Sequence, residues 1–284
     1  MIAVERHDDV TRYELSTRRS RAIGYSVSTY LVRGVLVDTG FHAVRHEVEH
    51  LARELRERND LRGALVTHRH EDHAGNVALL ARLELPIGLA AATLDALRTV
   101  GPIGFYRRYT WGTMPSLGDA PVTPLAGEAL AATGLVLLPT PGHSSDHHAV
   151  WDAERETLFG GDLFLGVKVR VAHPGENPRQ LAESLRAAAA LRPKRLFDAH
   201  RGAVLDDPTA KLLAKAAWIE ETVGEIDRLV AAGWSDAAIR RRVLGREEVA
   251  GYFSRGDYSR GNFVRAVRGT GSVLRDAAPS NRAG

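Results

Sequence analysis

Short apolar runs recur along the chain, and a histidine or an aspartate follows each of five such runs within a few residues. The runs lie at residues 35–37, 63–67, 135–138, 157–159 and 195–197. Their length, their content of Val, Leu and Phe, and the turn residues around them predict short buried β-strands. Since neighbouring strand ends lie side by side, we expect the polar residues that follow to converge on one edge of the fold.

Helical periodicity alternates with these strands. Val44, Val48, Leu51 and Leu55 recur at helical spacing and predict an amphipathic helix over residues 42–58. Asn177-Pro178 is a typical helix start, and the helix is predicted to end near residue 191. Residues 74–83 are predicted to form another helix, and residues 25–32 and 86–91 further strands. This interleaving predicts an α/β fold.

Two segments lie outside this alternation. Residues 100–124 are rich in aromatic residues and show no clear period. They predict a loop-and-turn insertion that either leans over the site as a lid or pocket wall, or attaches itself to the body through its aromatic rings. From residue 206 onward, three helices are predicted, with ends near residues 233, 245 and 269. We therefore predict a catalytic domain over residues 1–205 and a helical subdomain over residues 206–284, with a frayed tail from residue 277.

Composition places limits on the function. The chain has 284 residues, a formal net charge of +3 and no cysteine. No apolar stretch approaches the roughly 18 residues that a membrane helix needs, and the start lacks the layout of a signal peptide, so we expect a cytoplasmic protein without a membrane partner. The arginines are scattered, which disfavours a nucleic-acid partner without excluding one. The excess of arginine over lysine and the abundant alanine are typical of a bacterial protein with a GC-rich gene.

The apolar run at residues 63–67 leads directly into His68-Arg69-His70-Glu71-Asp72-His73. A chain that leaves a strand and turns can direct alternate side chains to one point, and imidazole and carboxylate groups suit first-row metals such as zinc. Four other loops carry the same residue types after a predicted strand. They contain Asp38, His143, Asp162 and His200. The sequence thus predicts a metal site built from several strand ends.

This ordered set of residues resembles that of the metallo-β-lactamase-fold hydrolases in their two-metal form, and the resemblance covers about the first 205 residues. It implies a four-layered αββα sandwich with a C-terminal helical extension. It also implies two divalent ions, zinc or alternatively manganese or iron, with Asp162 as the bridging ligand. The other implied ligands are His68, His70 and His143 for one ion and Asp72, His73 and His200 for the second. Asp72 and Asp38 are the implied catalytic residues, and Asp38 is expected to lie behind the ligands and orient them.

Residues that this chain lacks, or that differ from those of other proteins with this fold, limit the reactions that we expect it to catalyse. Without cysteine, the chain lacks the thiolate ligand of some true β-lactamases, and Asp162 occupies the bridging position as in glyoxalase II, lactonase and nuclease relatives. Flavodiiron proteins of this fold carry a glutamate at the position of His70, which argues against oxygen or nitric oxide chemistry. The complete second ligand set argues against the single iron of persulfide dioxygenases. We therefore expect hydrolysis by a hydroxide that bridges two metal ions.

The favoured substrate is a small carbonyl compound, either an ester, a thioester or a lactone. A phosphodiesterase or endoribonuclease is the alternative, because residues 140–147 resemble the matching segment of β-lactamase-like endoribonucleases. A binding protein with a vestigial site is disfavoured because no ligand position has been lost, and the oligomeric state stays open, with a homodimer as one possibility. The candidate substrate-binding residues are Phe105, Tyr106, Tyr109 and Trp111 in the insertion and Arg255, Tyr258, Arg260 and Asn262 near the C-terminus. His173, in a turn, has no evident partner in the sequence.

Overall fold

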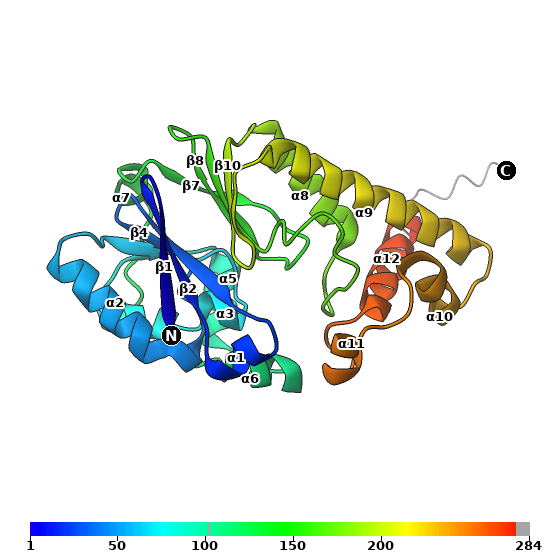
Figure 1. Ribbon diagram of the computed structural model, residues 1–284, viewed down its shortest axis with the longest axis horizontal. Helices are drawn as coiled ribbons and strands as arrows, with labels where there is room; N and C mark the ends of the chain where they lie inside the picture. Colours follow the sequence, from blue (N-terminus) through cyan, green and yellow to red (C-terminus); the bar gives the residue numbers. More distant parts are fainter. Residues whose placement is uncertain (102, 277–284) are drawn as a thin grey trace.

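Two β-sheets face each other at the centre of the protein, in a computed structural model that describes residues 1–101 and 103–276 (Figure 1). The first sheet holds its strands in chain order: β1 (Ile2–His7), β2 (Val10–Leu15), β3 (Val27–Val32), β4 (Val35–Val37), β5 (Gly63–Leu65) and β6 (Ile87–Gly88). The second sheet has the order β11-β10-β9-β8-β7. Its strands are β7 (Leu135–Pro139), β8 (His148–Asp152), β9 (Thr157–Gly161), β10 (Arg195–Asp198) and β11 (Gly202–Val204).

Strand direction explains why the predicted loops meet. β3 and β4 form a hairpin through Arg33 and Gly34, whose positive φ angles of 51° and 75° suit a two-residue turn. β4, β5 and β6 are parallel to one another, as are β9 and β10 in the second sheet. The carboxyl ends of β4 and β5 therefore share one edge of the first sheet, and those of β9 and β10 share one edge of the second.

Helices cover the outer face of each sheet. α2 (Arg45–Glu57) and α4 (Val77–Arg82) bury apolar side chains against the first sheet, in a cluster that includes Val48, Leu80 and Leu36. α8 (Pro178–Ala190) and α9 (Pro208–Ala231) do the same on the second sheet, and α12 (Arg260–Asp276) packs against these two helices. A third cluster, with Val35, Leu65, Phe159 and Phe197 among its members, fills the space between the sheets. The predicted αββα order with a C-terminal helical part is confirmed.

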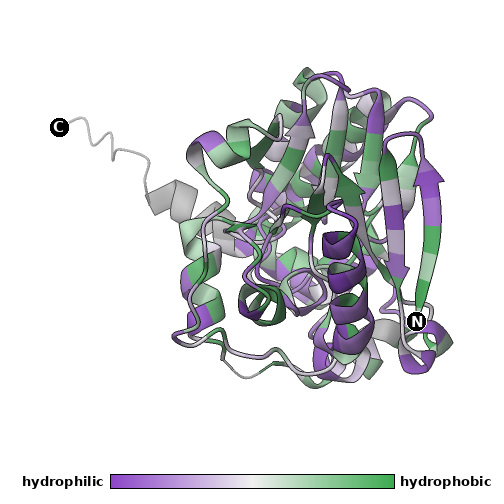
Figure 2. Cartoon of the chain, turned by 90° about the vertical axis from the view of Figure 1, so that its left-hand side faces the viewer, coloured by the Kyte–Doolittle hydropathy of each residue, from purple (hydrophilic) through white to green (hydrophobic). Residues whose placement is uncertain are grey.

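Hydropathy follows these layers. Figure 2 shows strands with both hydrophobic and hydrophilic segments, whereas the outer surface of α2, on the side turned toward the viewer, is mainly hydrophilic. In α2, the buried residues are Val48, Leu51, Ala52 and Leu55, which lie on one face as the sequence periodicity predicts. Among the described residues, no helix combines the length and the hydropathy needed to cross a membrane.

Short helices make up most of the connections. They are α1 (Arg18–Ala22), η1 (His42–Val44), α3 (Glu71–Ala74), α5 (Ala91–Arg98), α6 (Phe105–Trp111), α7 (Gly127–Ala131), α10 (Asp236–Ile239), the π-helical η2 (Arg240–Leu244) and α11 (Val249–Phe253). In Figure 1, α6 and α11 both lie at the lower edge of the molecule, although they are far apart along the chain.

Several segments differ from the sequence prediction. The insertion at residues 100–124 contains the helix α6, because Trp111 is buried against Phe41, with ring centroids 5.1 Å apart. The strand predicted over residues 86–91 is limited to β6, since α5 begins at Ala91. The helix predicted over residues 74–83 is present as the shorter α4, whereas α3, which precedes it, and α11 were not predicted. The predicted tail, residues 277–284, lies outside the described residues, and the division at residue 205 stays a prediction.

Candidate metal centre

The loop after β5 supplies four of the candidate ligands. His68 follows the strand, His70 directly precedes α3, and Asp72 and His73 lie within this single-turn helix. Because β5 is bordered by β4 and β6, its end is fixed by the sheet, and α3 turns the chain so that the side chains point back toward the second sheet.

Three loops of the second sheet supply the other ligands. His143 follows β7, Asp162 follows β9 and His200 follows β10. Gly161, with φ of +51°, lets this sheet approach the first one closely, since a Cβ there would lie 2.9 Å from the Thr67 hydroxyl oxygen. Packing therefore requires a glycine at position 161, directly before the aspartate that enters the site.

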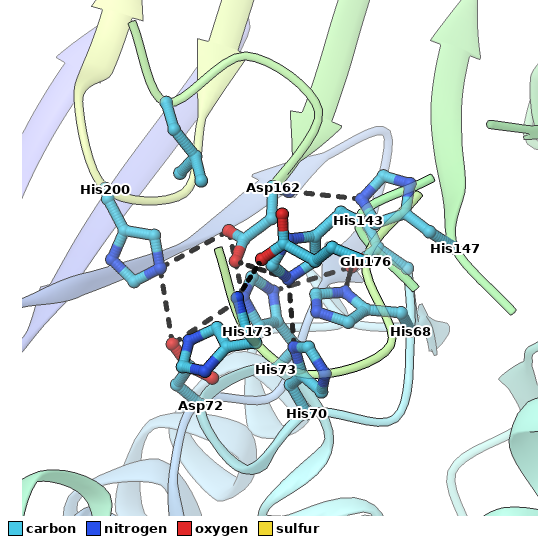
Figure 3. A network of polar contacts seen from close by, with 12 residues as sticks. His68, His70, Asp72, His73, His143, His147, Asp162, His173, Glu176 and His200 are labelled. Atoms are coloured by element: carbon cyan, nitrogen blue, oxygen red, sulfur yellow. Dashed lines mark hydrogen bonds and ion pairs between the residues drawn. The ribbon is translucent and has the colours of Figure 1, made fainter. Parts of the chain in front are cut away.

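These seven residues form two groups that meet at Asp162 (Figure 3). Asp162 Oδ2 lies 3.2 Å from His143 Nε2, and Oδ1 lies 3.2 Å from His73 Nε2 and 3.3 Å from His200 Nε2. The first group comprises His68, His70, His143 and Asp162, and the second Asp72, His73 and His200. Within each group, one ligand atom per residue lies within 4.8 Å of the others.

In four of the histidines, the ring nitrogen that points away from the centre, Nδ1, lies close to an oxygen atom. Nδ1 of His73 lies 2.8 Å from Asp38 Oδ2, and that of His200 lies 2.8 Å from the Ser26 carbonyl oxygen. Similarly, His68 Nδ1 lies 3.0 Å from Thr67 Oγ1, and His143 Nδ1 lies 3.5 Å from Glu176 Oε1. Since carbonyl and carboxylate oxygens accept hydrogen bonds only, they select for His73, His200 and His143 the tautomer whose Nε2 lone pair faces the centre. The Thr67 hydroxyl donates its proton to Asp38 Oδ1, so it acts as an acceptor toward His68.

The chemistry of this donor set fits metal ions. His68 Nε2 is buried and has no hydrogen-bond partner among the described residues, and His73 Nε2 and Asp162 Oδ1 are buried 3.2 Å from each other without forming a well-aligned hydrogen bond. Buried polar atoms without a partner are rare in native proteins and call for a bound ion or water. Imidazole nitrogens and carboxylate oxygens that converge in this way are typical zinc ligands. Burial lowers the pKa of His68 and His70 well below the usual range, and their neighbouring imidazoles add to the effect, so both are in the neutral form that binds metal.

The carboxylates stay ionised at this site. Burial raises the pKa of Asp162, but His73, His200 and His143 outweigh it, so the pKa lies well below the usual range. For His73 and His200, burial lowers the pKa, but Asp162 and Asp72 reverse the effect and raise it. The carboxylates and imidazoles therefore attract each other strongly in the absence of a cation.

Several residues at the centre carry no sequence signal. His147 is fully buried, and its Nε2 accepts a hydrogen bond of 3.1 Å from the backbone N–H of Asp162. Glu176, which contacts His143, precedes a helix N-cap and gives no pattern to detect. Glu71 is buried and forms an ion pair of 2.6 Å with Arg107 from α6, so the insertion is tied directly to the ligand loop.

A cavity of about 800 Å³ opens onto the two groups. Four of the predicted substrate-binding residues line it: Tyr106, Trp111, Tyr258 and Arg260. Trp111 also contributes to the core, and its ring centroid lies 5.9 Å from that of His200. Phe105 and Tyr109 lie further out, where they contact Phe253 of α11. We call these three residues, Phe105, Tyr109 and Phe253, the aromatic clasp.

The polar residues predicted near the C-terminus have partners within the fold. The Asn262 amide donates hydrogen bonds to the carbonyl oxygens of Ala172, Gly256 and Asp257, and Asn262 is not part of the cavity wall. Although Arg260 lines the cavity, its guanidinium is occupied by two carbonyl oxygens and by Glu248. Arg255 lies 5.1 Å from the ring centroid of Phe105, on the aromatic clasp.

His173, which showed no evident partner in the sequence, has several in the structure. Its Nδ1 lies 3.0 Å from the Asp257 carbonyl oxygen, and its ring stacks on Tyr258 with a centroid distance of 4.7 Å. The ring also lies beside His70 and His143, with centroids 6.1 and 6.4 Å apart (Figure 3). All of these partners lie on other segments of the chain, which is why the sequence did not reveal them.

Comparison with known proteins identifies the class. The family model of the metallo-beta-lactamase superfamily matches residues 22–200, a span that contains all seven candidate ligands. The chain belongs to this superfamily, whose members are metal-dependent hydrolases.

Among curated proteins, the chain is similar to the Beta-lactamase-like protein 2 homologs of Drosophila melanogaster and Caenorhabditis elegans. The fly protein is 30% identical over 194 residues, and the nematode protein 26% identical over 219 residues. These matches cover 65% and 70% of this chain, but only 61% and 66% of the two relatives.

Solved structures extend the fold comparison to the C-terminal helices. A metallo-beta-lactamase family protein from Thermus thermophilus has a TM-score of 0.65 at 18% identity, and the match covers 96% of this chain and 95% of that one. A DIM-1 metallo-beta-lactamase has a TM-score of 0.59, also at 18% identity, and covers 78% of this chain and 97% of its own. At this identity the likeness concerns the fold alone.

Proposed function

We propose that the protein is a dinuclear metal-dependent hydrolase of a small carbonyl substrate, an ester, a thioester or a lactone, that carries an anionic group. The observation that carries the proposal is the pair of ligand groups that share the Asp162 carboxylate beside a cavity of about 800 Å³. Cavities of this size enclose small molecules. Membership of a hydrolase superfamily supports the reaction type.

The donor set fits two divalent ions, of which zinc is the simplest choice for imidazole and carboxylate ligands. His68, His70 and His143 would hold one ion, Asp72, His73 and His200 the other, and Asp162 both. When bound, two such ions acidify a water molecule and polarise the substrate carbonyl.

The protein's own residues position the donors and handle protons. Asp38 accepts hydrogen bonds from the backbone N–H and the hydroxyl of Thr67 as well as from His73, so one carboxylate orients two parts of the ligand loop. We assign Asp72 as the acceptor of the proton that the attacking water gives up. Burial raises the pKa of Asp72, but His73 and His200 outweigh it and lower the pKa, so this carboxylate is ionised at neutral pH.

The cavity wall supports an anionic substrate. Lys168, Arg170 and Arg201 are exposed and line one side of it. Within the described part of the chain, none of the three forms an ion pair with a carboxylate. Unpaired cations beside a partly enclosed site attract anions and raise their local concentration. Tyr106, Trp111 and Tyr258 would contact the uncharged part of the substrate.

A second candidate, hydrolysis of phosphodiesters in single-stranded nucleic acid, is favoured by the aromatic clasp. Phe105 and Phe253 are partly exposed, Arg255 lies over the ring of Phe105, and Arg19 lies 4.9 Å from the ring centroid of Tyr109. Aromatic rings combined with arginines are the features that bind single-stranded nucleic acid without strong sequence preference. The basic cavity wall suits this substrate as well.

A substrate panel tests the proposal. Metal-quantified protein is assayed with p-nitrophenyl acetate, γ-butyrolactone, butyryl-coenzyme A, bis-p-nitrophenyl phosphate and a short single-stranded RNA, with chelated and then metal-reconstituted protein as controls. The proposal predicts chelator-sensitive turnover of at least one carbonyl substrate. It also predicts faster turnover of butyryl-coenzyme A, which carries phosphates, than of butyryl-N-acetylcysteamine, which has the same thioester and no charge.

The Lys168→Ala, Arg170→Ala double variant locates the anion site. It is expected to remove most of the preference for the charged thioester, roughly 10-fold or more in kcat/KM, since each lost ionic hydrogen bond is worth about 1.5–3 kcal/mol. The uncharged thioester provides the internal control and is expected to react at the wild-type rate. Chelator-sensitive cleavage of RNA and bis-p-nitrophenyl phosphate, without any carbonyl turnover, would replace the first proposal with the second.

A further inference from the structure

Lys215 is a buried cation in the C-terminal helix α9. Its side chain is only 2% exposed, and Nζ donates hydrogen bonds to the carbonyl oxygens of Leu163, at 3.0 Å, and Phe164. These two residues directly follow Asp162, the carboxylate that both ligand groups share. A helix outside the span matched by the superfamily model thus reaches the loop that carries the central ligand.

A buried ammonium without a counterion is unfavourable, so its presence needs a reason. Among the described residues, no carboxylate lies within ion-pairing distance of Lys215. Burial lowers its pKa to about 8, while the more distant Asp198, Glu176 and Asp162 raise it. The interactions that hold the side chain in place are therefore the two backbone carbonyls after Asp162.

The main chain around Asp162 is fixed by hydrogen bonds on both sides. The Asp162 N–H donates to His147 Nε2 at 3.1 Å, and the Leu163 N–H donates to the Gly160 carbonyl at 2.9 Å. The Leu165 N–H donates to Asp198 Oδ2 at 2.6 Å, although Leu165 has an unfavourable positive φ of 50°. Between these points, the Leu163 and Phe164 carbonyls depend on Lys215.

We propose that Lys215 is a positioning residue: by holding the carbonyls of Leu163 and Phe164, it sets the direction in which the Asp162 carboxylate enters the two ligand groups. This inference rests on the proposed metal-binding function and adds a part to it, because it makes α9 a component of the site. Lys211, one turn earlier on the same helix, provides a contrast, since it lies near the surface and pairs with the exposed Asp206.

Metal binding tests this role without any substrate. Lys215→Met keeps the length of the side chain and removes its donors, Lys215→Gln keeps an N–H donor, and Lys211→Met is the matched control. For each variant, zinc affinity is measured by competition with a chromophoric chelator, at a temperature well below its own unfolding midpoint. We expect Lys215→Met to bind zinc at least 10-fold more weakly than wild type, Lys215→Gln to recover part of the loss, and Lys211→Met to match wild type.

A chemical rescue separates positioning from general destabilisation. In Lys215→Ala, ethylammonium is expected to restore zinc affinity in a saturable way, whereas tetramethylammonium, which has no N–H, is expected to have no effect. If the variants at position 215 unfold at lower temperature but bind zinc with wild-type affinity, Lys215 is only a stabilising residue and the proposal is wrong. If the wild-type protein itself binds no metal, the proposed metal-dependent function is wrong. That outcome differs from the one in which only the positioning role of Lys215 is wrong.

Discussion

Single residues next to the ligands decide whether the donor atoms point to one place. Each of the histidines 68, 73, 143 and 200 is held at Nδ1 by an oxygen atom, so that Nε2 is left for the centre. Asp38 does this for His73 and also fixes Thr67, and it is only 2% exposed. At the residue scale, the site is therefore organised by the partners of the ligands, of which Asp38 and Thr67 do not line the cavity, whereas Ser26 and Glu176 do.

The role of Asp38 leads to a prediction. Asp38→Asn removes the charge and leaves a single acceptor oxygen for His73 and Thr67, so His73 loses its fixed tautomer. We expect metal affinity to fall by roughly 10–100-fold, the usual effect of removing a partner of a ligating histidine. Competition with a chromophoric chelator measures it.

Asp152 provides the matched control. It is fully buried and paired with Arg33 at 2.7 Å, but it does not belong to the ligand groups. Asp152→Asn is expected to lower stability while leaving metal affinity unchanged. If both variants bind metal with the same affinity as wild type, Asp38 does not orient the site.

At the scale of elements, α6 and α11 meet above the cavity. Tyr106 of α6 lines the cavity, and its ring lies 6.2 Å from that of Phe253 and 6.3 Å from that of Tyr258. Arg107 of the same helix is paired with Glu71 in the ligand loop. The insertion is thus held between the metal loop on one side and the C-terminal helices on the other.

Removing Phe253 tests this arrangement. Phe253→Ala deletes the ring contacts of α11 with Phe105, Tyr106 and Tyr109, so Tyr106 loses one support at the cavity wall. Phe253 is 42% exposed, so the free energy of unfolding is expected to change by no more than about 1 kcal/mol. We expect KM for the best substrate of the panel to rise several-fold, while metal content stays the same.

Val249→Ala on the same helix is the control, since Val249 is 84% exposed and has no ring. Its KM is expected to equal that of wild type. Equal KM values for Phe253→Ala and wild type would mean that the aromatic clasp does not shape the substrate site.

On the scale of the whole molecule, each ligand group spans the two sheets. His68 and His70 follow a strand of the first sheet, whereas His143 and Asp162 follow strands of the second. The second group likewise joins Asp72 and His73 to His200. A bound ion would therefore link the two halves of the sandwich, in addition to the apolar core between them.

Metal removal should consequently lower thermal stability. A ligand at a free concentration about 1,000 times its Kd stabilises the native state by about 4 kcal/mol, which corresponds to a shift of roughly 10 °C for a chain of this size. We expect chelation to lower the unfolding midpoint by such an amount, as followed by circular dichroism, and added zinc to restore it. For His200→Ala, which lacks a ligand of the second group, the shift on chelation is expected to be smaller. An unfolding midpoint that does not respond to chelation would contradict the link between the sheets.

The sequence by itself determined the strand ends and the histidine-rich ligand loop, because these features depend on local spacing. The αββα order and the two ligand groups were implied by the resemblance of the ordered ligand set to that of the metallo-β-lactamase-fold hydrolases. His68 to His73 lie in one turn after a buried strand, and Val48 to Leu55 repeat at helical intervals, so their neighbours can be predicted without knowing the rest of the fold. The helix α6 escaped prediction because it has no apolar period, and it forms where Trp111 packs on Phe41, a residue from a distant part of the chain.

Only the tertiary structure decided the roles of the polar residues near the C-terminus. Asn262 binds backbone carbonyls, Arg260 is occupied by carbonyls and Glu248, and Lys215 is buried and binds the carbonyls of the two residues after Asp162. Nothing in their local sequence distinguishes these three from substrate-binding or surface residues. The physical reason is that a polar side chain is satisfied by whichever partner the fold brings within hydrogen-bonding distance. For these residues the partners lie up to 90 positions away, whereas the apolar pattern of a strand or helix is complete within a few turns.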